Sequence, residues 1–481
     1  MKNIISILLI TLVFAACSNE DYENLNRDPN NPTQVDPGQL FVGATKTLYD
    51  QIESTNVNEN VFRLFAQYWT ETTYVDEANY DLSTRNITGY LWDNIYQNVL
   101  YDLKDAKSNS SDDPFKVAQI EVLEVYAWQL LVDAFGDVPY TDALQANEAL
   151  FLPSYDSAAS VIYPDLLSRI DTAISGLSGS TGRGFENYDL IYGNNRVNWI
   201  KFAQSLKVKL AMRLADADPT KAQTAVEAAY VNAITKNTEN AIIVYEGSTP
   251  NTNPLWEDLV QSGRNDYIPA NTIVDYLNVL EDPRRDIFFD PTSKIDVDTT
   301  AVVNLQYKGG TYGAQSSFGA HSHIGDKLHD PTFRGVLMDA TEVHFNLAEA
   351  AARGWNVGGT AEEYYTAGIK TNFEDWGLSS EAATIYLANP EVAYTTAPGD
   401  WKEKIALQYW IAMYNRGFEG WYIFRKFDGP KLNIAANSQL PVPKRYTYPV
   451  DEQSLNATNW SAISNNGATD LLQTPIFWDK Q

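Results

Sequence analysis

Three of the four histidines of this 481-residue chain lie in one short segment, and metal binding is the chemistry that they could support. His321 and His323 occupy alternate positions, so in an extended segment both imidazoles point to one side, and a third ligand would complete a zinc site. The preceding residues are rich in glycine and serine and offer no visible supporting shell. Hydrogen bonding to a ligand or plain exposure is therefore favoured, and we predict no metal and no cofactor. The other potential ligands weighed in the same way are His329, Asp326 and Asp330 for zinc, and Asp28, Asn30 and Asn31 for calcium.

Catalytic chemistry is disfavoured by the motifs that the sequence lacks. Glycoside hydrolysis needs only two carboxylates, and 62 acidic residues make such a pair uninformative. The chain contains no Gly-x-Ser-x-Gly elbow, His-Glu-x-x-His motif, phosphate-binding loop or dinucleotide fingerprint. We therefore predict that the protein is not an enzyme, and a glycoside hydrolase is the less favoured alternative.

Aromatic residues are abundant, and two polar segments carry them in patterns typical of sugar binding. Residues 69–92 have no helical periodicity between Thr72 and Asn86 and interleave aromatic rings with amide, carboxylate and guanidinium groups. Residues 253–323 spread aromatic rings among glycine, serine and asparagine. The alternative is that these rings fix long loops to the body of the protein. The predicted ligand-binding residues are Trp69, Tyr74, Asn79, Tyr80 and Arg85 in the first segment, and Trp256, Tyr312, Phe318 and His321 in the second.

The only cysteine, Cys17, follows a short apolar segment and two alanines. Residues 4–14 are almost wholly apolar but too few to span a bilayer, which is typical of a secretory signal. Small residues directly before a cysteine favour lipoprotein processing and acylation of Cys17, although Phe14 departs from the usual aliphatic residue; the alternative is a free cysteine after an ordinary signal. We predict a signal peptide at residues 1–16 and a lipidated tether at residues 17–37.

The net charge of −27 disfavours nucleic acid and anionic lipid as partners. It also disfavours strongly anionic glycans, because Arg63, Arg85 and Arg264 are scattered along the sequence. A neutral glycan is the modestly preferred ligand.

The elements that position these residues are mainly helical. Apolar spacing predicts helices near residues 38–52, 61–69, 89–107, 114–134, 156–177, 196–215, 219–235, 269–280, 337–354, 361–376 and 401–427. Strands are predicted only at residues 241–245 and 302–307. Residues 340–377 place small residues opposite large ones across a short turn, as a tetratricopeptide-like pair requires. Because no linker divides the chain, we predict one domain over residues 38–481.

Several segments resemble the SusD/RagB family of outer-membrane lipoproteins. They are Cys17 and residues 26–33 (NRDPNNPT), 126–144 (YAWQLLVDAFGDVPYTDAL), 342–355 (EVHFNLAEAAARGW), 405–429 (IALQYWIAMYNRGFEGWYIFRKFDG) and 441–459 (PVPKRYTYPVDEQSLNATN). The resemblance implies a SusD-like fold with four tetratricopeptide-like helix pairs, long irregular loops and a few short strands. It also implies a cell-surface protein that delivers oligosaccharides to a SusC-like TonB-dependent transporter; one branch of the family captures peptides instead.

The segments that carry the resemblance are expected to be scaffold. In residues 136–140 (GDVPY), glycine ends a helix and proline prevents its continuation, which predicts a turn. Tyr409, Trp410 and Trp421 share helical spacing with isoleucines and are predicted to be core. Arg425 and Lys426 are predicted to form an ion pair with Glu419.

Overall fold

The structure is a computed structural model that describes residues 35–145, 152–179, 181–295 and 304–480. The predicted signal peptide, Cys17, most of the tether and the weighed calcium cluster lie outside these residues. The described chain begins where the sequence predicts a helix. The side chain of Asp36 accepts a hydrogen bond of 2.7 Å from the backbone N–H of Gly38 and caps helix α3 (Pro37–Glu53).

Helices make up most of the described residues, as predicted. After α3 come α4 (Phe62–Phe65), α5 (Ile87–Asp93), α6 (Tyr101–Ser108), α7 (Pro114–Phe135), α8 (Tyr163–Gly179), α9 (Arg196–Arg213), α10 (Pro219–Ala229), α11 (Pro254–Trp256), α12 (Asn271–Val279), α13 (Arg285–Phe288), α14 (Ala340–Ala352), α15 (Ala361–Asp375), α16 (Ser380–Leu387), α17 (Trp401–Ala412), α18 (Gly417–Phe427), α19 (Val450–Leu455) and α20 (Ala457–Ile463). In the described parts of the chain, we find no helix with the length and apolar composition needed to cross a bilayer.

Short antiparallel strand pairs connect segments that are often distant in sequence. The pairs are β1 (Trp69–Glu71) with β5 (Tyr267–Pro269), β2 (Val138–Pro139) with β3 (Tyr155–Asp156), β4 (Ala241–Ile243) with β10 (Gly335–Met338), β6 (Phe289–Asp290) with β9 (His323–Ile324), and β7 (Ser293–Ile295) with β8 (Asn304–Gln306). The predicted strand at residues 241–245 is confirmed as β4. That at residues 302–307 corresponds to β8, with positions 302 and 303 outside the described residues.

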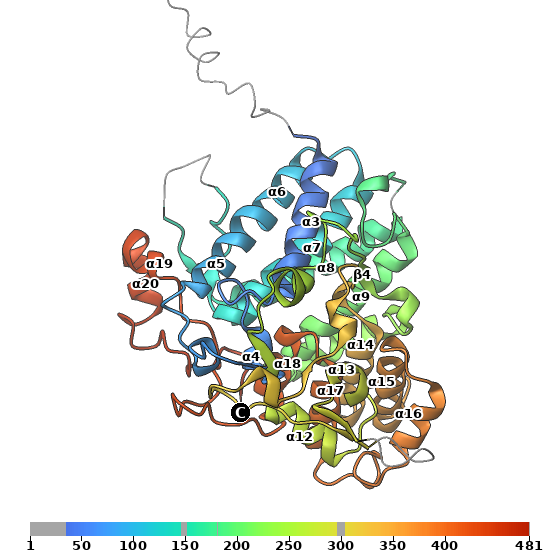
Figure 1. The fold of residues 1–481 in the computed structure, drawn as a ribbon. Helices are drawn as coiled ribbons and strands as arrows, with labels where there is room; N and C mark the ends of the chain where they lie inside the picture. The colour runs from blue at the N-terminus through green and yellow to red at the C-terminus, as the bar shows by residue number, and fades with distance from the viewer. Residues whose placement is uncertain (1–34, 146–151, 180, 296–303, 481) are drawn as a thin grey trace, which may run out of the picture.

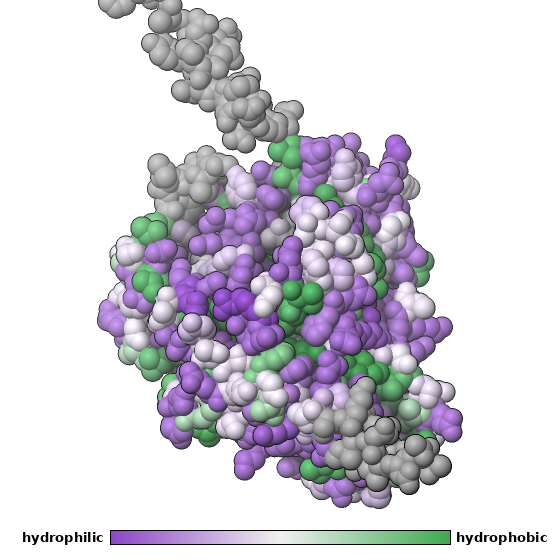
Figure 2. All heavy atoms as spheres, in the orientation of Figure 1, coloured by the Kyte–Doolittle hydropathy of each residue, from purple (hydrophilic) through white to green (hydrophobic). Residues whose placement is uncertain are grey.

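Successive helices pack as pairs around a common core. Helix α7 packs against α8, α8 against α9, and α9 against α10; a second group contains α14 with α15 and α17 with α18. Figure 1 shows α3, α6 and α7 in the upper half of the molecule, α14 to α17 in the lower half, and α19 and α20 at one edge. The segments around β1, β5 and β9 are largely irregular outside these short strands. Figure 2 shows a face of the molecule on which hydrophilic residues predominate and hydrophobic residues are scattered among them.

The predicted turn at residues 136–140 is confirmed. Helix α7 begins at Pro114, where the side chain of Asp113 accepts two backbone hydrogen bonds, and ends at Gly136. Gly136 has a φ of +86°, which side chains with a Cβ rarely adopt. The chain then turns into β2.

Three predicted helices differ from the structure. Residues 401–427 form two helices, because the backbone of Gly417 passes so close to that of Arg63 that a Cβ on Gly417 would lie 2.4 Å from the Arg63 nitrogen. The start of the segment 337–354 is part of β10, and α14 begins only at Ala340. In residues 61–69 only α4 is helical, and Trp69 starts β1. Helices α11, α13, α16, α19 and α20 were not predicted.

The predicted aromatic core is confirmed. Tyr409, Trp410 and Trp421 are fully buried, and the indole N–H of Trp410 donates to the carbonyl of Ala66 at 3.0 Å. These rings therefore hold α17 and α18 to the chain around α4.

The expected partners of Glu419 are wrong. Lys209 and Arg213 of α9 contact the Glu419 carboxylate, with Arg213 Nη2 at 2.8 Å from Oε2. Lys426 instead lies 2.9 Å from Asp216. Arg425 donates to backbone carbonyls, including that of Asp133 at 2.7 Å. The reason is helical geometry: on α18, Arg425 and Lys426 lie roughly 9–11 Å further along the axis than Glu419. Lys426 therefore meets the end of α9 at the carbonyl of Met212 and the carboxylate of Asp216.

Candidate glycan-binding site

The pairing of β1 with β5 brings the two predicted binding segments together. Glu71 at the end of β1 lies opposite Tyr267 at the start of β5. Beyond this pair, the backbone N–H of Thr72 donates to the carbonyl of Asp266 at 2.9 Å, and its hydroxyl donates to the carbonyl of Asn265 at 2.7 Å. The loop after β1 and the loop before β5 therefore face each other across a pocket.

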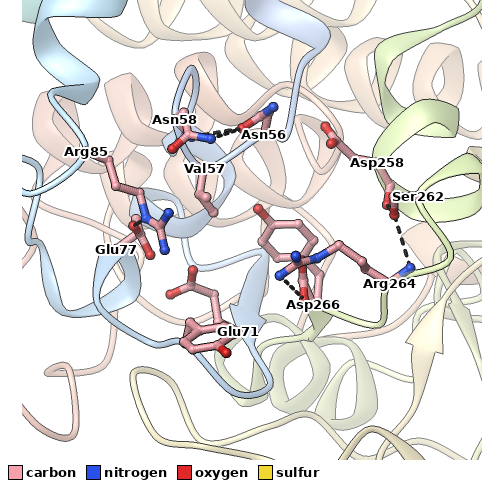
Figure 3. Close-up of a pocket in the computed structure, with 12 residues that line it drawn as sticks. Asn56, Val57, Asn58, Glu71, Glu77, Arg85, Asp258, Ser262, Arg264 and Asp266 are labelled. Atoms are coloured by element: carbon pink, nitrogen blue, oxygen red, sulfur yellow. Dashed lines mark hydrogen bonds and ion pairs between the residues drawn. The ribbon is translucent and has the colours of Figure 1, made fainter.

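The pocket has a volume of about 220 Å³ and is lined from three parts of the chain. This is smaller than the roughly 300–1,000 Å³ of sites that enclose a drug-sized ligand, so the pocket has room only for a smaller group. Figure 3 shows Arg85 and Glu77 on one side of the pocket and Arg264 with Asp266 on the other. The lining residues are Asn56, Val57, Asn58, Glu71, Tyr74, Glu77, Arg85, Asp258, Ser262, Arg264, Asp266 and Tyr267.

Tyr74 is the exposed aromatic residue of the pocket. Its side chain is 62% exposed, although the loop that carries it is anchored at both ends. The amide of Gln315 donates to the carbonyl of Thr73 at 2.8 Å, and the backbone N–H of Ala78 donates to Glu71 Oε2 at 2.9 Å. Tyr74 therefore presents a ring face of the kind that stacks on the apolar side of a sugar.

Both arginines of the pocket are held by carboxylates. Arg85 donates through Nε to Oε1 of Glu77. Arg264 donates through Nε to Oδ2 of Asp266 at 2.5 Å and through Nη2 to Oδ1 at 3.2 Å. The hydrogen bond and charge of Asp266 raise the pKa of the Arg264 guanidinium. Each arginine retains further N–H groups for a ligand, since a guanidinium has five donors.

Two carboxyl groups of the pocket have raised pKa values. Burial raises the pKa of Glu71 to about 9, and the neighbouring carboxyl of Glu77 adds to the effect against the hydrogen bond from Ala78. Burial also raises the pKa of Asp258 to about 6, with the charge of Glu59 acting in the same direction. At neutral pH Glu71 is therefore protonated, and the floor of the pocket carries less negative charge than its sequence implies.

A second, smaller pocket of about 120 Å³ adjoins the first. Arg264, Asp266 and Tyr267 line both pockets. The second pocket also includes Phe318 and His323, whose rings stack with centroids 3.8 Å apart. The predicted segments 69–92 and 253–323 thus contribute to one continuous region.

Four predicted binding residues lie at this region or beside it. Tyr74 and Arg85 line the first pocket, and Phe318 lines the second. His321 lies beside Phe318, where its Nδ1 is 2.8 Å from the carbonyl oxygen of Ser317. Among the described residues, no group of three or more His, Cys, Asp or Glu side chains is placed to hold a metal ion.

The other predicted residues do not line either pocket. Trp69, Tyr80 and Tyr312 are buried, so their rings offer no face to a ligand, and the buried indole N–H of Trp69 donates to the hydroxyl of Tyr414 at 3.0 Å. Both amide hydrogens of Asn79 bond backbone carbonyls, and its oxygen accepts from two backbone N–H groups. Trp256 is half-buried in α11 and lines neither pocket.

Sequence reasoning missed most of the polar lining. Asn56, Asn58 and Asp266 reach the pocket from loops, and Asp258 from the helical turn Glu257–Gln261, and none of these segments carries a distinctive motif. No local signal marks them, because β1 and β5 have only three residues each and all of these are buried, so neither strand shows an alternating pattern. The pairing of the two strands fixes which loops meet.

A larger groove of about 910 Å³ runs over α6, α7 and α8. The charged side chains on its floor form ion pairs with one another: Lys107 and Arg169 each contact both Glu121 and Glu124. None of the predicted ligand-binding residues lines this groove. The pockets beside β1 and β5 are therefore the better candidate site.

The fold and this polar pocket with an exposed aromatic ring define a helical binding protein. The family model described as "Starch-binding associating with outer membrane" matches residues 29–449, and the chain belongs to this SusD-like family. A search of the curated proteins finds no match.

Several solved structures match the fold of this protein over nearly the whole chain. A chitin-binding protein matches with a TM-score of 0.80 and 25% identity, covering 93% of this chain and 100% of its own. A chitin-binding SusD homologue from Flavobacterium johnsoniae matches with a TM-score of 0.76 and 25% identity, covering 91% and 98%. A SusD homologue from Bacteroides uniformis has a TM-score of 0.77 and 24% identity, covering 92% and 99%, and supports the fold.

Proposed function

We propose that the protein captures a neutral glycan at the cell surface through the pockets beside β1 and β5. The observation that carries this proposal is Tyr74, an exposed ring above a pocket with two guanidinium groups and several carboxyl groups. A ring face for sugar C–H groups beside donors and acceptors for hydroxyls is what saccharide binding requires. The family model and the two chitin-binding likenesses support the same ligand class.

A neutral ligand follows from the charges of the pocket. Arg85 is paired with Glu77, and Arg264 with Asp266, so each guanidinium is already neutralised. An anionic sugar would have to displace these pairs in a protein of net charge −27. Oligomers of N-acetylglucosamine and of glucose are therefore the first ligands to test.

We further propose that the chain is lipidated on Cys17, anchored at the outer membrane, and passes its ligand to a SusC-like TonB-dependent transporter. The small residues before Cys17 support the anchor, and the family description supports the membrane. Metabolic labelling with a fatty acid tests the anchor: label in the wild type and none in Cys17→Ser is expected. Co-purification of a barrel transporter with the full chain tests the partner.

Isothermal titration calorimetry tests the glycan proposal. A saturable signal with a neutral oligosaccharide, weakened in Tyr74→Ala, is expected. Binding of peptides with no response to any glycan would instead favour the peptide-capturing branch of the family. Release of shorter sugars by the purified protein alone would favour a glycoside hydrolase.

A further inference from the structure

The second pocket contains a histidine with one ring nitrogen available to a ligand. His323 lies in β9, opposite Asp290 of β6, and both residues line this pocket. Nε2 of His323 is 3.1 Å from the carbonyl oxygen of Phe318. Because a carbonyl oxygen can only accept, Nε2 carries a hydrogen and donates it. In the neutral imidazole, Nδ1 then has no hydrogen and acts as an acceptor.

Nδ1 of His323 is accessible and has no protein partner among the described residues. Within these residues, the bond from Nε2 to Phe318 is the hydrogen bond that the His323 ring makes. Nδ1 is not one of the side-chain nitrogens that are buried without a partner, in contrast to Nδ1 of His344 in α14. It can therefore accept a hydrogen bond from a ligand in the pocket.

The His323 ring is also held in a fixed orientation. It stacks on the ring of Phe318, with centroids 3.8 Å apart and an angle of 14° between the two planes. The backbone carbonyl of the same residue accepts the bond from Nε2. Phe318 thus fixes both the plane of the imidazole and its rotation within that plane. A ligand that bonds to Nδ1 does not have to order this side chain, which lowers the cost of binding.

His321, the histidine selected from the sequence, is placed differently. Its Nδ1 is 2.8 Å from the carbonyl oxygen of Ser317, and its side chain lines neither pocket. The two histidines thus bond the carbonyls of adjacent residues, Ser317 and Phe318. Of the two, His323 is the one that reaches the pocket.

The two pockets together accommodate a larger ligand than the first pocket alone. Their combined volume comes to the lower end of the roughly 300–1,000 Å³ of sites that enclose a drug-sized ligand. Arg264, Asp266 and Tyr267 line both pockets, so a ligand can extend from one to the other beside these side chains. A guanidinium only donates, whereas Nδ1 of His323 only accepts. A sugar hydroxyl does both, so neighbouring hydroxyls of one chain can satisfy both groups.

We propose that the second pocket is a further saccharide subsite, in which His323 accepts a hydrogen bond from a sugar hydroxyl through Nδ1. The inference rests on the proposed glycan site and deepens it. The ligand is an oligosaccharide long enough to extend from Tyr74 past Arg264 to His323. Affinity then increases with chain length until the second pocket is filled.

The first test needs no ligand. Nuclear magnetic resonance of protein labelled with ¹⁵N in its four histidines distinguishes the two imidazole tautomers, and His323→Phe assigns the signals of this residue by removing them. At pH 8, His323 should carry a hydrogen on Nε2 and none on Nδ1. A hydrogen on Nδ1 would overturn the proposal, because this atom could then not accept a bond from a ligand.

Calorimetry tests the contact, with the disaccharides and pentasaccharides of N-acetylglucosamine and of glucose as probes. The wild type should bind one of the pentasaccharides about tenfold more tightly than the matching disaccharide. His323→Phe keeps a ring that can stack on Phe318 but has no acceptor. It should lose about fivefold in affinity for the pentasaccharide, as expected for one neutral hydrogen bond, and bind the disaccharide like the wild type. Equal affinities of wild type and His323→Phe for the pentasaccharide would overturn the subsite.

A second variant covers the case in which His323→Phe does not fold. His323→Gln supplies an amide nitrogen that can donate to the carbonyl of Phe318 and an amide oxygen that can accept from the sugar. It should therefore retain most of the affinity for the pentasaccharide. His321→Phe separates the two histidines, and a loss of affinity confined to this variant would overturn the assignment to His323.

The outcomes also separate the subsite from the glycan site on which it rests. Equally tight binding of the disaccharide and the pentasaccharide by the wild type would contradict the subsite and leave the glycan site standing. Absence of binding to all of these probes would contradict the glycan site and, with it, the subsite.

Discussion

Arg264 and Asp266 form an ion pair, with 2.5 Å between Nε and Oδ2, that stands between two pockets and lines both. Their backbone is fixed by the bonds from Thr72 to the carbonyls of Asn265 and Asp266. The backbone of this segment is therefore held by hydrogen bonds, whereas the exposed side chains of Arg264 and Asp266 can change conformation. A ligand that occupied both pockets would lie beside this ion pair.

Replacing Arg264 with alanine removes the ion pair between the two pockets. We expect Arg264→Ala to weaken glycan binding about tenfold, because one guanidinium donor is lost, and to leave the free energy of unfolding nearly unchanged, because the ion pair is exposed to solvent. Calorimetry and urea denaturation measure the two effects. Arg183→Ala removes an equally local exposed pair with Glu186 and should leave binding unchanged; equal affinities for both variants would contradict the site.

Tyr74 is expected to contribute through its ring face. Tyr74→Ala should lower glycan affinity by about tenfold, equivalent to about 1.4 kcal/mol, with little change in thermal stability because the side chain is largely exposed. Tyr74→Phe should retain most of the affinity. Tyr188→Ala, in a tyrosine that is also exposed but lies outside both pockets, is the control. A loss in Tyr188→Ala of the same size would show a general effect on folding.

The raised pKa of Glu71 also predicts how stability depends on pH. Burial and the Glu77 carboxyl raise this pKa from 4.5 to about 9, so between these values the folded protein binds more protons than the unfolded chain. The free energy of unfolding should fall as pH rises through this window, by at most about 1.4 kcal/mol per pH unit from this group. Urea denaturation at pH 5, 7 and 8.5 should show wild type losing stability relative to Glu71→Gln. A constant difference between the two proteins would contradict the pKa.

The buried charges of α9 and α18 predict a large effect on stability. Burial acts to raise the pKa of Glu419, but Lys209 and Arg213 outweigh it and hold this pKa well below its usual range. Glu419→Gln should therefore destabilise the fold by about 3–5 kcal/mol at neutral pH, because two buried cations lose a charged partner. The difference from wild type should shrink as the pH falls toward the pKa of Glu419.

Urea denaturation checks this prediction against an exposed glutamate. Glu186→Gln removes a pair with Arg183 that is open to solvent and should cost less than about 1 kcal/mol. Equal effects of the two substitutions would show that the buried pair contributes no more than the exposed one.

The helical scaffold could be predicted because long periodic segments and their caps are local signals. Asp36, Asp113 and Gly136 mark helix ends in the sequence, and the structure places caps at all three. The break between α17 and α18 could not be predicted in this way. It follows from the close approach of Gly417 to Arg63, which are more than 350 positions apart.

The candidate site was predictable only in part, because it also depends on contacts between segments that are distant in sequence. Aromatic rings in polar loops predict Tyr74 and Phe318, which line the two pockets, but the same pattern selects Trp69 and Tyr312, which the fold buries. Exposure is set by tertiary packing, and three-residue strands such as β1 and β5 have too little periodicity to be recognised. Asp258 and Asp266 reach the pocket only through that pairing.

The central claim is that the pocket beside Tyr74 binds a neutral glycan. The most direct measurement is calorimetric titration of the protein and of Tyr74→Ala with neutral oligosaccharides, including those of N-acetylglucosamine and glucose. Saturable binding of at least one of them by the wild type, weakened about tenfold in Tyr74→Ala, is the predicted result. Absence of binding to every neutral glycan, or binding that is unaffected in Tyr74→Ala, would contradict the claim.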